Sequence, residues 1–157
     1  MGARAKRVDV GSMAPDFTVS SQSGALVSLK DLLGERPVVL FFYPRDDTLG
    51  CTRQACAFRD RYEEFAKLDA WVVGISSDPV SSHERFAQKH GLPFTLLSDE
   101  GGRVRELHGI PRTFGLFPGR VTYVDDAEGV VRHVFFSQLG VTRHVEEVLG
   151  ALRGIKA

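Results

Sequence analysis

The stretch Tyr43-Pro-Arg-Asp-Asp-Thr-Leu-Gly-Cys-Thr-Arg-Gln-Ala-Cys56 holds both cysteines of the chain and joins two different hydrophobic patterns. The apolar run that precedes it, Val38 to Tyr43, is short and rich in β-branched and aromatic residues, which predicts a buried central strand ending at Pro44. Large apolar residues then recur every three or four positions from Ala55 to Leu68, which predicts a helix packed on the sheet. The cysteines therefore stand near the N-terminus of a helix that follows a buried strand.

Strand and helix patterns alternate along the rest of the chain. Further strands are predicted at 16–20, 26–28, 71–76, 92–97, 121–125 and 130–136, and helices at 29–34, 79–90, 99–108 and 141–152. The first two strands form a hairpin at one end of the sheet, and the last two form a second hairpin. This order predicts an α/β fold with a central mixed β-sheet, helices on both faces and an N-terminal β-hairpin. We expect residues 11–157 to form one domain and the basic residues 1–10 to form a flexible tail.

Composition limits the classes of function. The 157 residues are 43% hydrophobic, which suits a domain with a buried core. Twenty basic and twenty acidic residues cancel, so no net charge draws the protein to nucleic acid or an anionic membrane. No run approaches the roughly 18 apolar residues of a membrane span, and the first residues lack the apolar region of a signal peptide. These features predict a cytoplasmic protein with neither a nucleic-acid nor a membrane partner.

The two cysteines are the candidate reactive groups. Cytosolic thiols are kept reduced, so these are either inert or catalytic rather than a structural disulfide. If Thr48 caps the helix, Cys51 lies in its first turn, where backbone N–H groups and the helix dipole stabilise a thiolate. On a regular helix the Cα atoms of Cys51 and Cys56 lie about 8 to 9 Å apart, whereas a disulfide requires less than roughly 7 Å. A bond between them therefore requires the first turns to unwind.

Other chemistries fit the sequence less well. The cysteines do not form the Cys-x-x-Cys motif of dithiol reductases. The histidines lack the spacing of zinc ligands, and each is expected to be exposed or hydrogen-bonded: His83, His90, His108, His133 and His144. Asp46 and Asp47 are neighbours on a loop that do not face each other, so both are expected to be solvated. Arg45 and Arg53 are expected on the surface.

Pro44-x-x-x-Thr48-x-x-Cys51 is similar to the active-site signature of the peroxiredoxins. Cys56, five residues later, resembles the Q or bacterioferritin comigratory protein subgroup, in which both thiols lie on one helix. Segments 11–17, 51–60, 92–100 and 118–124 resemble the family at corresponding places, and the likeness covers about residues 9 to 153. It implies a thioredoxin-like fold and a thiol peroxidase that reduces hydrogen peroxide and organic hydroperoxides in antioxidant defence.

The resemblance also implies a role for each site residue. Cys51 resembles the peroxidatic nucleophile, which attacks the terminal peroxide oxygen and becomes a sulfenic acid, and Cys56 resembles the resolving thiol. Thr48 would offer its hydroxyl to the thiolate and the peroxide, and Pro44 would shield the site from water. Arg120 would stabilise the thiolate and polarise the O–O bond.

Thioredoxin or a related dithiol reductase would then reduce the disulfide, with no bound cofactor, and the protein would be a monomer. The segment Phe114 to Phe117, just before Arg120, would either line the pocket or fill the core. Two alternatives stay open. One is a dithiol–disulfide oxidoreductase acting on proteins, against which the missing Cys-x-x-Cys motif argues. The other is a non-catalytic redox sensor, in which oxidation of Cys51 and Cys56 melts the helix and switches a binding surface.

Overall fold

The computed structural model describes residues 7–110 and 119–156. The strands are β1 (Thr18–Ser21), β2 (Leu26–Ser28), β3 (Val38–Phe42), β4 (Trp71–Ser76), β5 (Thr95–Ser98), β6 (Val121–Asp125) and β7 (Val131–Phe136). The helices are α1 (Leu29–Leu32), α2 (Leu49–Asp60), α3 (Tyr62–Lys67), α4 (Val80–His90), α5 (Arg103–Leu107) and α6 (Arg143–Lys156), and η1 (Glu100–Gly102) is a 3-10 turn. None of the helices within these ranges is both long and apolar enough to cross a bilayer.

The strands form one mixed sheet in the order β2-β1-β5-β4-β3-β6-β7. The central strand β3 pairs in parallel with β4 and antiparallel with β6, and all five of its residues are buried. The predicted N-terminal hairpin joins one edge of the sheet through β1 and β5, and the second hairpin, β6 with β7, forms the other edge. The predicted mixed sheet, central strand and two hairpins are confirmed.

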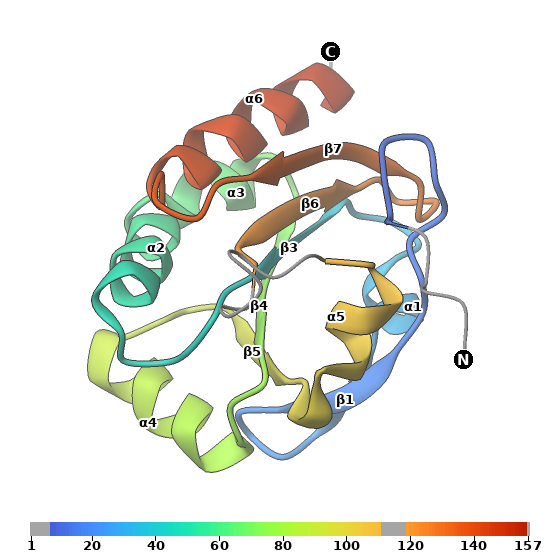
Figure 1. Cartoon of the computed structure of the whole chain (residues 1–157). Coiled ribbons are helices and arrows are strands. Elements are labelled where there is room, and N and C mark those ends of the chain that lie inside the picture. Colours follow the sequence, from blue (N-terminus) through green and yellow to red (C-terminus); the bar gives the residue numbers. More distant parts are fainter. Residues whose placement is uncertain (1–6, 111–118, 157) are drawn as a thin grey trace.

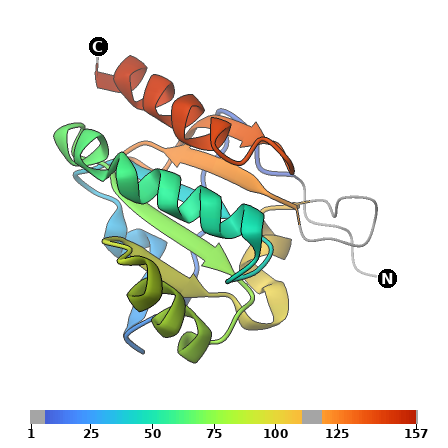
Figure 2. The same ribbon diagram turned by 90° about the vertical axis from the view of Figure 1, so that its left-hand side faces the viewer.

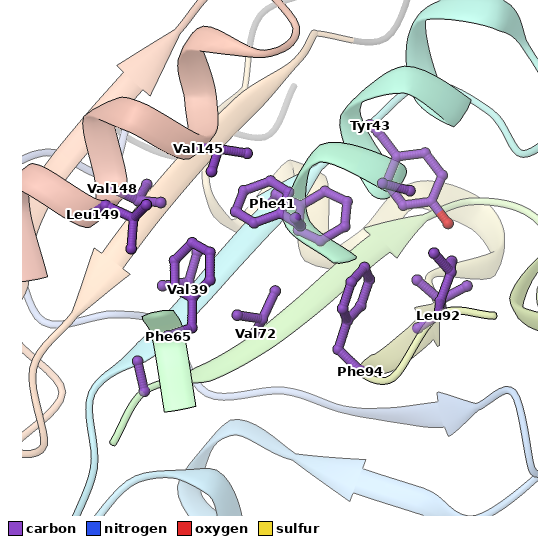
Figure 3. Packing of buried hydrophobic residues seen from close by; sticks show 14 of the residues in the cluster. Val39, Phe41, Tyr43, Phe65, Val72, Leu92, Phe94, Val145, Val148 and Leu149 are labelled. Carbon is purple, nitrogen blue, oxygen red and sulfur yellow. The ribbon is translucent and has the colours of Figure 1, made fainter. Parts of the chain in front are cut away.

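Helices cover both faces of this sheet (Figure 1). On one face, α2 lies between α6 and α4 (Figure 2), and with α3 they pack on Val39 and Phe41 of β3. On the other face, α1 and α5 pack with the alternate β3 residues Val38, Leu40 and Phe42. In Figure 3, Phe41 lies between the α6 residues, Val145, Val148 and Leu149, and the pair Phe94 and Leu92. The apolar residues of the last helix therefore face the core.

Several predicted elements differ in their bounds, the last helix among them, which runs over Arg143–Lys156 instead of 141–152. The helix predicted to run to Leu68 is two helices, because the backbone leaves helical geometry at Arg61, with φ −105° and ψ 10°. Phe58 and Phe65 are buried on either side of the break, so the hydrophobic pattern continues through it and does not reveal it. The strand predicted from Leu92 begins at Thr95, since Pro93 has no N–H to donate to a ladder.

The helix predicted over 99–108 is divided by two glycines. Gly101 and Gly102 have positive φ angles of 82° and 73°, so the α-helix begins only at Arg103. The Asp99 carboxylate accepts the backbone N–H groups of Val104 at 2.9 Å and Arg105 at 3.0 Å. The Asp99 carboxylate thus satisfies two N–H groups of the first turn of α5, whose N-cap position is Gly102.

Two predictions concern segments at the limits of the described residues. Residues 1–6 of the expected tail lie outside them, as do the segment Phe114 to Phe117 and Pro118. Within the described part of the expected tail, Val8 is buried and its N–H donates to the carbonyl of His108 at 3.0 Å. The backbone of Gly11 likewise bonds to Val131 at 2.8 Å. The part of the tail around Val8 is thus packed on the domain instead of extending from it.

Candidate active site

The loop after β3 leads directly into α2 and sets the position of Cys51. Thr48 occupies the N-cap position with extended backbone angles, φ −85° and ψ 154°, and Cys51 is the third residue of the helix. The N–H of Thr52 donates to the Thr48 carbonyl at 2.9 Å. The amides that precede Thr52 therefore belong to the turn whose N–H groups have no acceptor within the helix. The predicted location of Cys51 in a first helical turn is confirmed.

The side chain of Thr48 makes a different contact from the expected one. Its hydroxyl donates to the carbonyl of Arg45 at 3.0 Å, and it makes no side-chain capping bond. Between these residues Asp47 adopts φ 59°, a left-handed conformation that Asp tolerates, and this closes a tight turn. Because a hydroxyl has one proton to donate, Thr48 in this state offers the site an acceptor rather than a donor.

Arg120 brings a buried positive charge to Cys51 from just before β6. Its side chain is buried, and its Nη2 donates to the Cys51 Sγ at 3.4 Å. Its Nε donates to the carbonyl of Gln138 at 3.1 Å and its Nη1 to the Oε1 of Gln54. Within residues 7–110 and 119–156 its side-chain acceptors are a thiol, a carbonyl and an amide. A guanidinium with uncharged partners in a buried place favours an anionic sulfur.

Gln54 is a site residue that the sequence analysis missed. It is fully buried and lies three positions after Cys51, on the same face of α2. Its carbonyl oxygen accepts from Arg120, while its Nε2 has no partner in the described part of the chain. The available signal was a polar residue inside the otherwise apolar stripe of this helix. Gln54 therefore holds the guanidinium through Nη1, while the Gln138 carbonyl holds it through Nε.

Gly50 gives the guanidinium access to the start of α2. A Cβ at this position would lie 3.2 Å from the Nη2 of Arg120 and 3.6 Å from a methyl carbon of Val141. The distance to Nη2 is shorter than nine in ten of the contacts that Cβ atoms make with neighbouring atoms in proteins. The absent side chain therefore lets Arg120 pack against the first turn, beside Cys51.

Cys56 and Pro44 lie on opposite sides of this turn in sequence. Both cysteines are free, with Cys51 buried and Cys56 half-buried. The helix is continuous from Leu49 to Asp60, so the separation of about 8 to 9 Å expected of a regular helix applies to them. Pro44 is half-buried at the start of the loop, directly after the buried Tyr43.

The prediction that Asp46 is solvated is wrong. It is buried, and its carboxylate accepts from the hydroxyl of Tyr43 at 2.6 Å, from Ser82 at 2.8 Å and from the Nδ1 of His83 at 2.7 Å. Burial alone would raise the pKa of Asp46, but the hydrogen bonds from His83 and Tyr43 outweigh it and hold this pKa below its ordinary value. Ser82 and His83 belong to α4 and lie 36 and 37 positions away, so no local pattern around Asp46 reveals these two donors.

This cluster is a hydrogen-bond network rather than a cation site. Asp46, Asp78 and His83 place one ligand-type atom each within 4.8 Å of one another. However, the Asp78 Oδ2 already accepts the N–H of Asp46 at 2.8 Å and the hydroxyl of Ser76 at 2.5 Å. His83 faces acceptors through both ring nitrogens, since its Nε2 lies 2.9 Å from the Leu97 carbonyl. It is hydrogen-bonded, as expected, and it ties the active-site loop to α4.

The remaining charged residues of the loop region behave as predicted. Asp47 is exposed and pairs with Lys89 at 3.3 Å, and Arg45 and Arg53 are exposed. The site thus comprises Cys51, Arg120 and Gln54 in direct contact, with Thr48 and the Asp46 network shaping the loop in front of them. Such a site can stabilise a thiolate and then a negative charge that develops on a neighbouring oxygen.

Comparisons with known proteins agree with this chemistry. Residues 10–134 match the family model described as "AhpC/TSA family". The chain is 51% identical to a rice (Oryza sativa subsp. japonica) protein named peroxiredoxin Q, chloroplastic, over 95% of this chain and 69% of the relative.

Solved structures give the same result. A crystal structure of peroxidoxin BcpB from Mycobacterium tuberculosis superposes with a TM-score of 0.89 at 38% identity, covering 96% of this chain and all of that one. A bacterioferritin comigratory protein from Xanthomonas campestris, which has alkyl peroxide reduction activity, superposes with a TM-score of 0.84 at 29% identity, covering 96% of this chain and 98% of that one. These neighbours confirm the predicted thioredoxin-like fold.

The predicted cytoplasmic location is wrong. The rice relative is chloroplastic, as are relatives of about 50% identity from wheat and Arabidopsis thaliana. These relatives contradict the cytoplasmic location predicted from composition. Composition is a weak guide to location, because a targeting signal is independent of the charge and core of a folded domain. The chain belongs to the AhpC/TSA family as a Q-type peroxiredoxin, a thiol peroxidase that reduces hydroperoxides with electrons from a thioredoxin-type reductant.

Proposed function

We propose that Cys51 is the peroxidatic thiol of this enzyme. The observation that carries the proposal is the 3.4 Å contact between the Cys51 Sγ and the Nη2 of Arg120, in a buried first helical turn. The guanidinium and the helix N-terminus both favour the thiolate, which is the reactive form. No other thiol in the chain has this setting, because Cys56 lies beyond the first turn.

In the first step, the Cys51 thiolate attacks the terminal oxygen of the hydroperoxide and the O–O bond breaks. Sulfur is oxidised to a sulfenic acid, and the other oxygen leaves with both bonding electrons and takes up a proton as water or an alcohol. Arg120 stabilises the charge that develops on the leaving oxygen. Thr48 accepts a hydrogen bond from the peroxide hydroxyl, and Pro44 shields the sulfur from water.

In the second step, Cys56 resolves the sulfenic acid. Its sulfur attacks the Cys51 sulfur, an S–S bond forms, and the sulfenic oxygen leaves as water. Since the two residues stand about 8 to 9 Å apart on a regular helix, the first turns of α2 must unwind for this bond to form. A thioredoxin-type dithiol then reduces the disulfide by exchange and leaves as its own disulfide.

Alkyl hydroperoxides belong to the substrates under this proposal, together with hydrogen peroxide. The alkyl peroxide reduction named for the X. campestris relative supports this choice. We also propose that the chain acts as a monomer and folds as one domain that includes residues 11–157. The single sheet with one helical layer on each face supports a single domain.

The test is peroxide consumption coupled to thioredoxin, thioredoxin reductase and NADPH, with the wild type, Cys51→Ser and Cys56→Ser. We expect sustained turnover in the wild type and none with Cys51→Ser. Cys56→Ser should consume one equivalent and then hold a sulfenic acid that dimedone traps. Wild-type turnover by Cys51→Ser would reject the assignment of the nucleophile. Slow oxidation of both thiols without turnover would favour the redox-sensor alternative.

A further inference from the structure

The ladder between β3 and β6 ends just where both strands enter the site. The last paired residues are Phe42 and Val121. Beyond Phe42 the chain passes through Tyr43 into Pro44, and before Val121 it passes from Gly119 into Arg120. The peptide units that lead into Pro44 and Arg120 therefore lie outside the β3–β6 ladder, although Cys51 and Arg120 must be held within 3.4 Å of each other.

Arg105 of α5 connects these two peptide units. Its Nη2 donates to the carbonyl of Tyr43 at 3.1 Å, and its Nη1 donates to the carbonyl of Gly119. The first carbonyl belongs to the peptide bond that enters Pro44, and the second to the peptide bond that enters Arg120. One planar guanidinium thus spans both segments, with the two-pronged geometry that distinguishes Arg from Lys.

Arg105 is itself held firmly enough to act as a support. Its backbone N–H donates to the carboxylate of Asp99 at 3.0 Å, and Asp99 is buried. Its guanidinium carbon lies 5.7 Å from the centre of the Phe42 ring, in the range of a cation–π contact. Because Phe42 is fully buried at the end of β3, the side chain is packed on a fixed surface.

We propose that Arg105 is a positioning residue for the peroxidase reaction, which sets the place of Arg120 relative to Cys51 by binding the two carbonyls that enter the site. It acts from the opposite face of the sheet and does not touch the sulfur. The proposal rests on the proposed roles of Cys51 and Arg120. A catalytic group displaced by about 1 Å can lose up to about a hundredfold in rate.

The test separates the oxidation of Cys51 from its resolution in single-turnover experiments. Sulfenic acid formation is timed by quenching with dimedone in a Cys56→Ser background, and disulfide formation is timed in protein that retains Cys56. Arg105→Met, which keeps length but loses both donors, should slow oxidation at least about tenfold. It should leave the rate of disulfide formation unchanged, and the amplitude of oxidation per mole of total protein should also be unchanged. A general loss of folding would instead lower the amplitude.

Arg105→Lys tests the two-pronged contact, because an ammonium group on a flexible stem cannot reproduce the planar fork. Compared with Arg105→Met, we expect Arg105→Lys to restore the stability of the fold but to recover less than half of the oxidation rate that Arg105→Met loses. Guanidinium ion at millimolar concentration should partly rescue Arg105→Ala. Arg103→Met is the control: it alters an exposed residue of the same helix and should leave every rate unchanged.

Two outcomes would overturn the proposal. Wild-type oxidation rates in both Arg105→Met and Arg105→Lys would show that the bridge is not needed. Equal losses in oxidation, resolution and amplitude would show a merely structural residue. Arg120→Met, measured in parallel, shows whether the Arg105 proposal or the proposed function has failed. An unchanged oxidation rate in Arg120→Met would reject the proposed role of Arg120 itself.

Discussion

At the scale of single residues, the site depends on how closely a buried cation approaches one turn of backbone. Arg120 reaches Cys51 because Gly50 has no side chain, and Gln54 holds the guanidinium from the helix face. A single methyl group added at Gly50 is therefore expected to move the guanidinium relative to the sulfur. Such a change should affect stability and activity in opposite directions.

Gly50→Ala should raise helix stability yet lower activity. Alanine is favoured over glycine in helices by roughly 0.5–1 kcal/mol, but the new Cβ would stand 3.2 Å from the Nη2 of Arg120 and push it from the sulfur. We expect sulfenic acid formation to slow about tenfold or more, with an unfolding midpoint at or above that of the wild type. The measurements are stopped-flow oxidation and urea unfolding.

Gly150→Ala is the matched control for that prediction. Gly150 lies in α6, and a Cβ there would meet nothing within 4 Å. This variant should gain stability and keep its oxidation rate. If Gly50→Ala oxidises as fast as Gly150→Ala, close approach of the guanidinium to the first turn is not required.

At the scale of elements, the loop between β3 and α2 is held by α4 as well as by bonds within the loop. Asp46 accepts donors from Tyr43, Ser82 and His83, so removing its charge leaves buried donors without a full partner. Leaving a buried hydrogen-bonding group without its partner costs about 1–3 kcal/mol, and more where one partner is charged. Asp46→Asn should therefore lose stability on the order of 3 kcal/mol in urea unfolding, and it should also slow oxidation of Cys51.

Asp47→Asn provides the comparison from the neighbouring position. Asp47 is exposed and its pair with Lys89 is a surface pair, which contributes about 0–1 kcal/mol. A difference of less than about 1 kcal/mol between the two variants would contradict the importance of the network.

The elements also show which features a sequence can reveal. The strands β3 and β4 and both hairpins follow from local patterns of period and turn chemistry, and these were predicted. The break at Arg61, the burial of Asp46 and the part played by Gln54 depend on contacts with residues far away in the chain. The residues next to a position in the sequence carry little of that information. Asp46 and Asp47 are adjacent and of the same type, yet the first is buried and the second is exposed.

At the scale of the whole molecule, β6 links the site to a buried carboxyl group. Arg120 precedes this strand and Asp125 is its last residue, so the two lie at opposite ends of the strand. Asp125 is fully buried, and neither of its carboxyl oxygens has a partner in the described ranges. Burial, with a smaller effect of the adjacent Asp126, raises the pKa of Asp125 to about 7. The folded protein therefore retains a proton that the unfolded chain releases near pH 4.

This proton makes global stability depend on pH with a defined sign. Between pH 4 and 7 the native state binds more protons than the unfolded chain, so the contribution of Asp125 to stability falls as pH rises and is at its lowest above pH 7. Asp125→Asn removes this penalty, and we expect a gain on the order of 2–4 kcal/mol at pH 8 that vanishes near pH 4. Urea unfolding of both proteins at several pH values measures the difference.

Asp126→Asn should behave in the opposite way, although it changes the next residue. Burial would raise the pKa of Asp126, but the hydrogen bond from Arg132 and those from the backbone of Val130 and Glu128 lower it below its ordinary value. A lowered carboxyl pKa contributes stability above pH 4 that is lost as pH falls further. Asp126→Asn should therefore destabilise the protein at pH 8 and matter less in acid. If Asp125→Asn destabilises the protein at pH 8 as Asp126→Asn does, Asp125 carries no penalty for ionisation and the buried proton is ruled out.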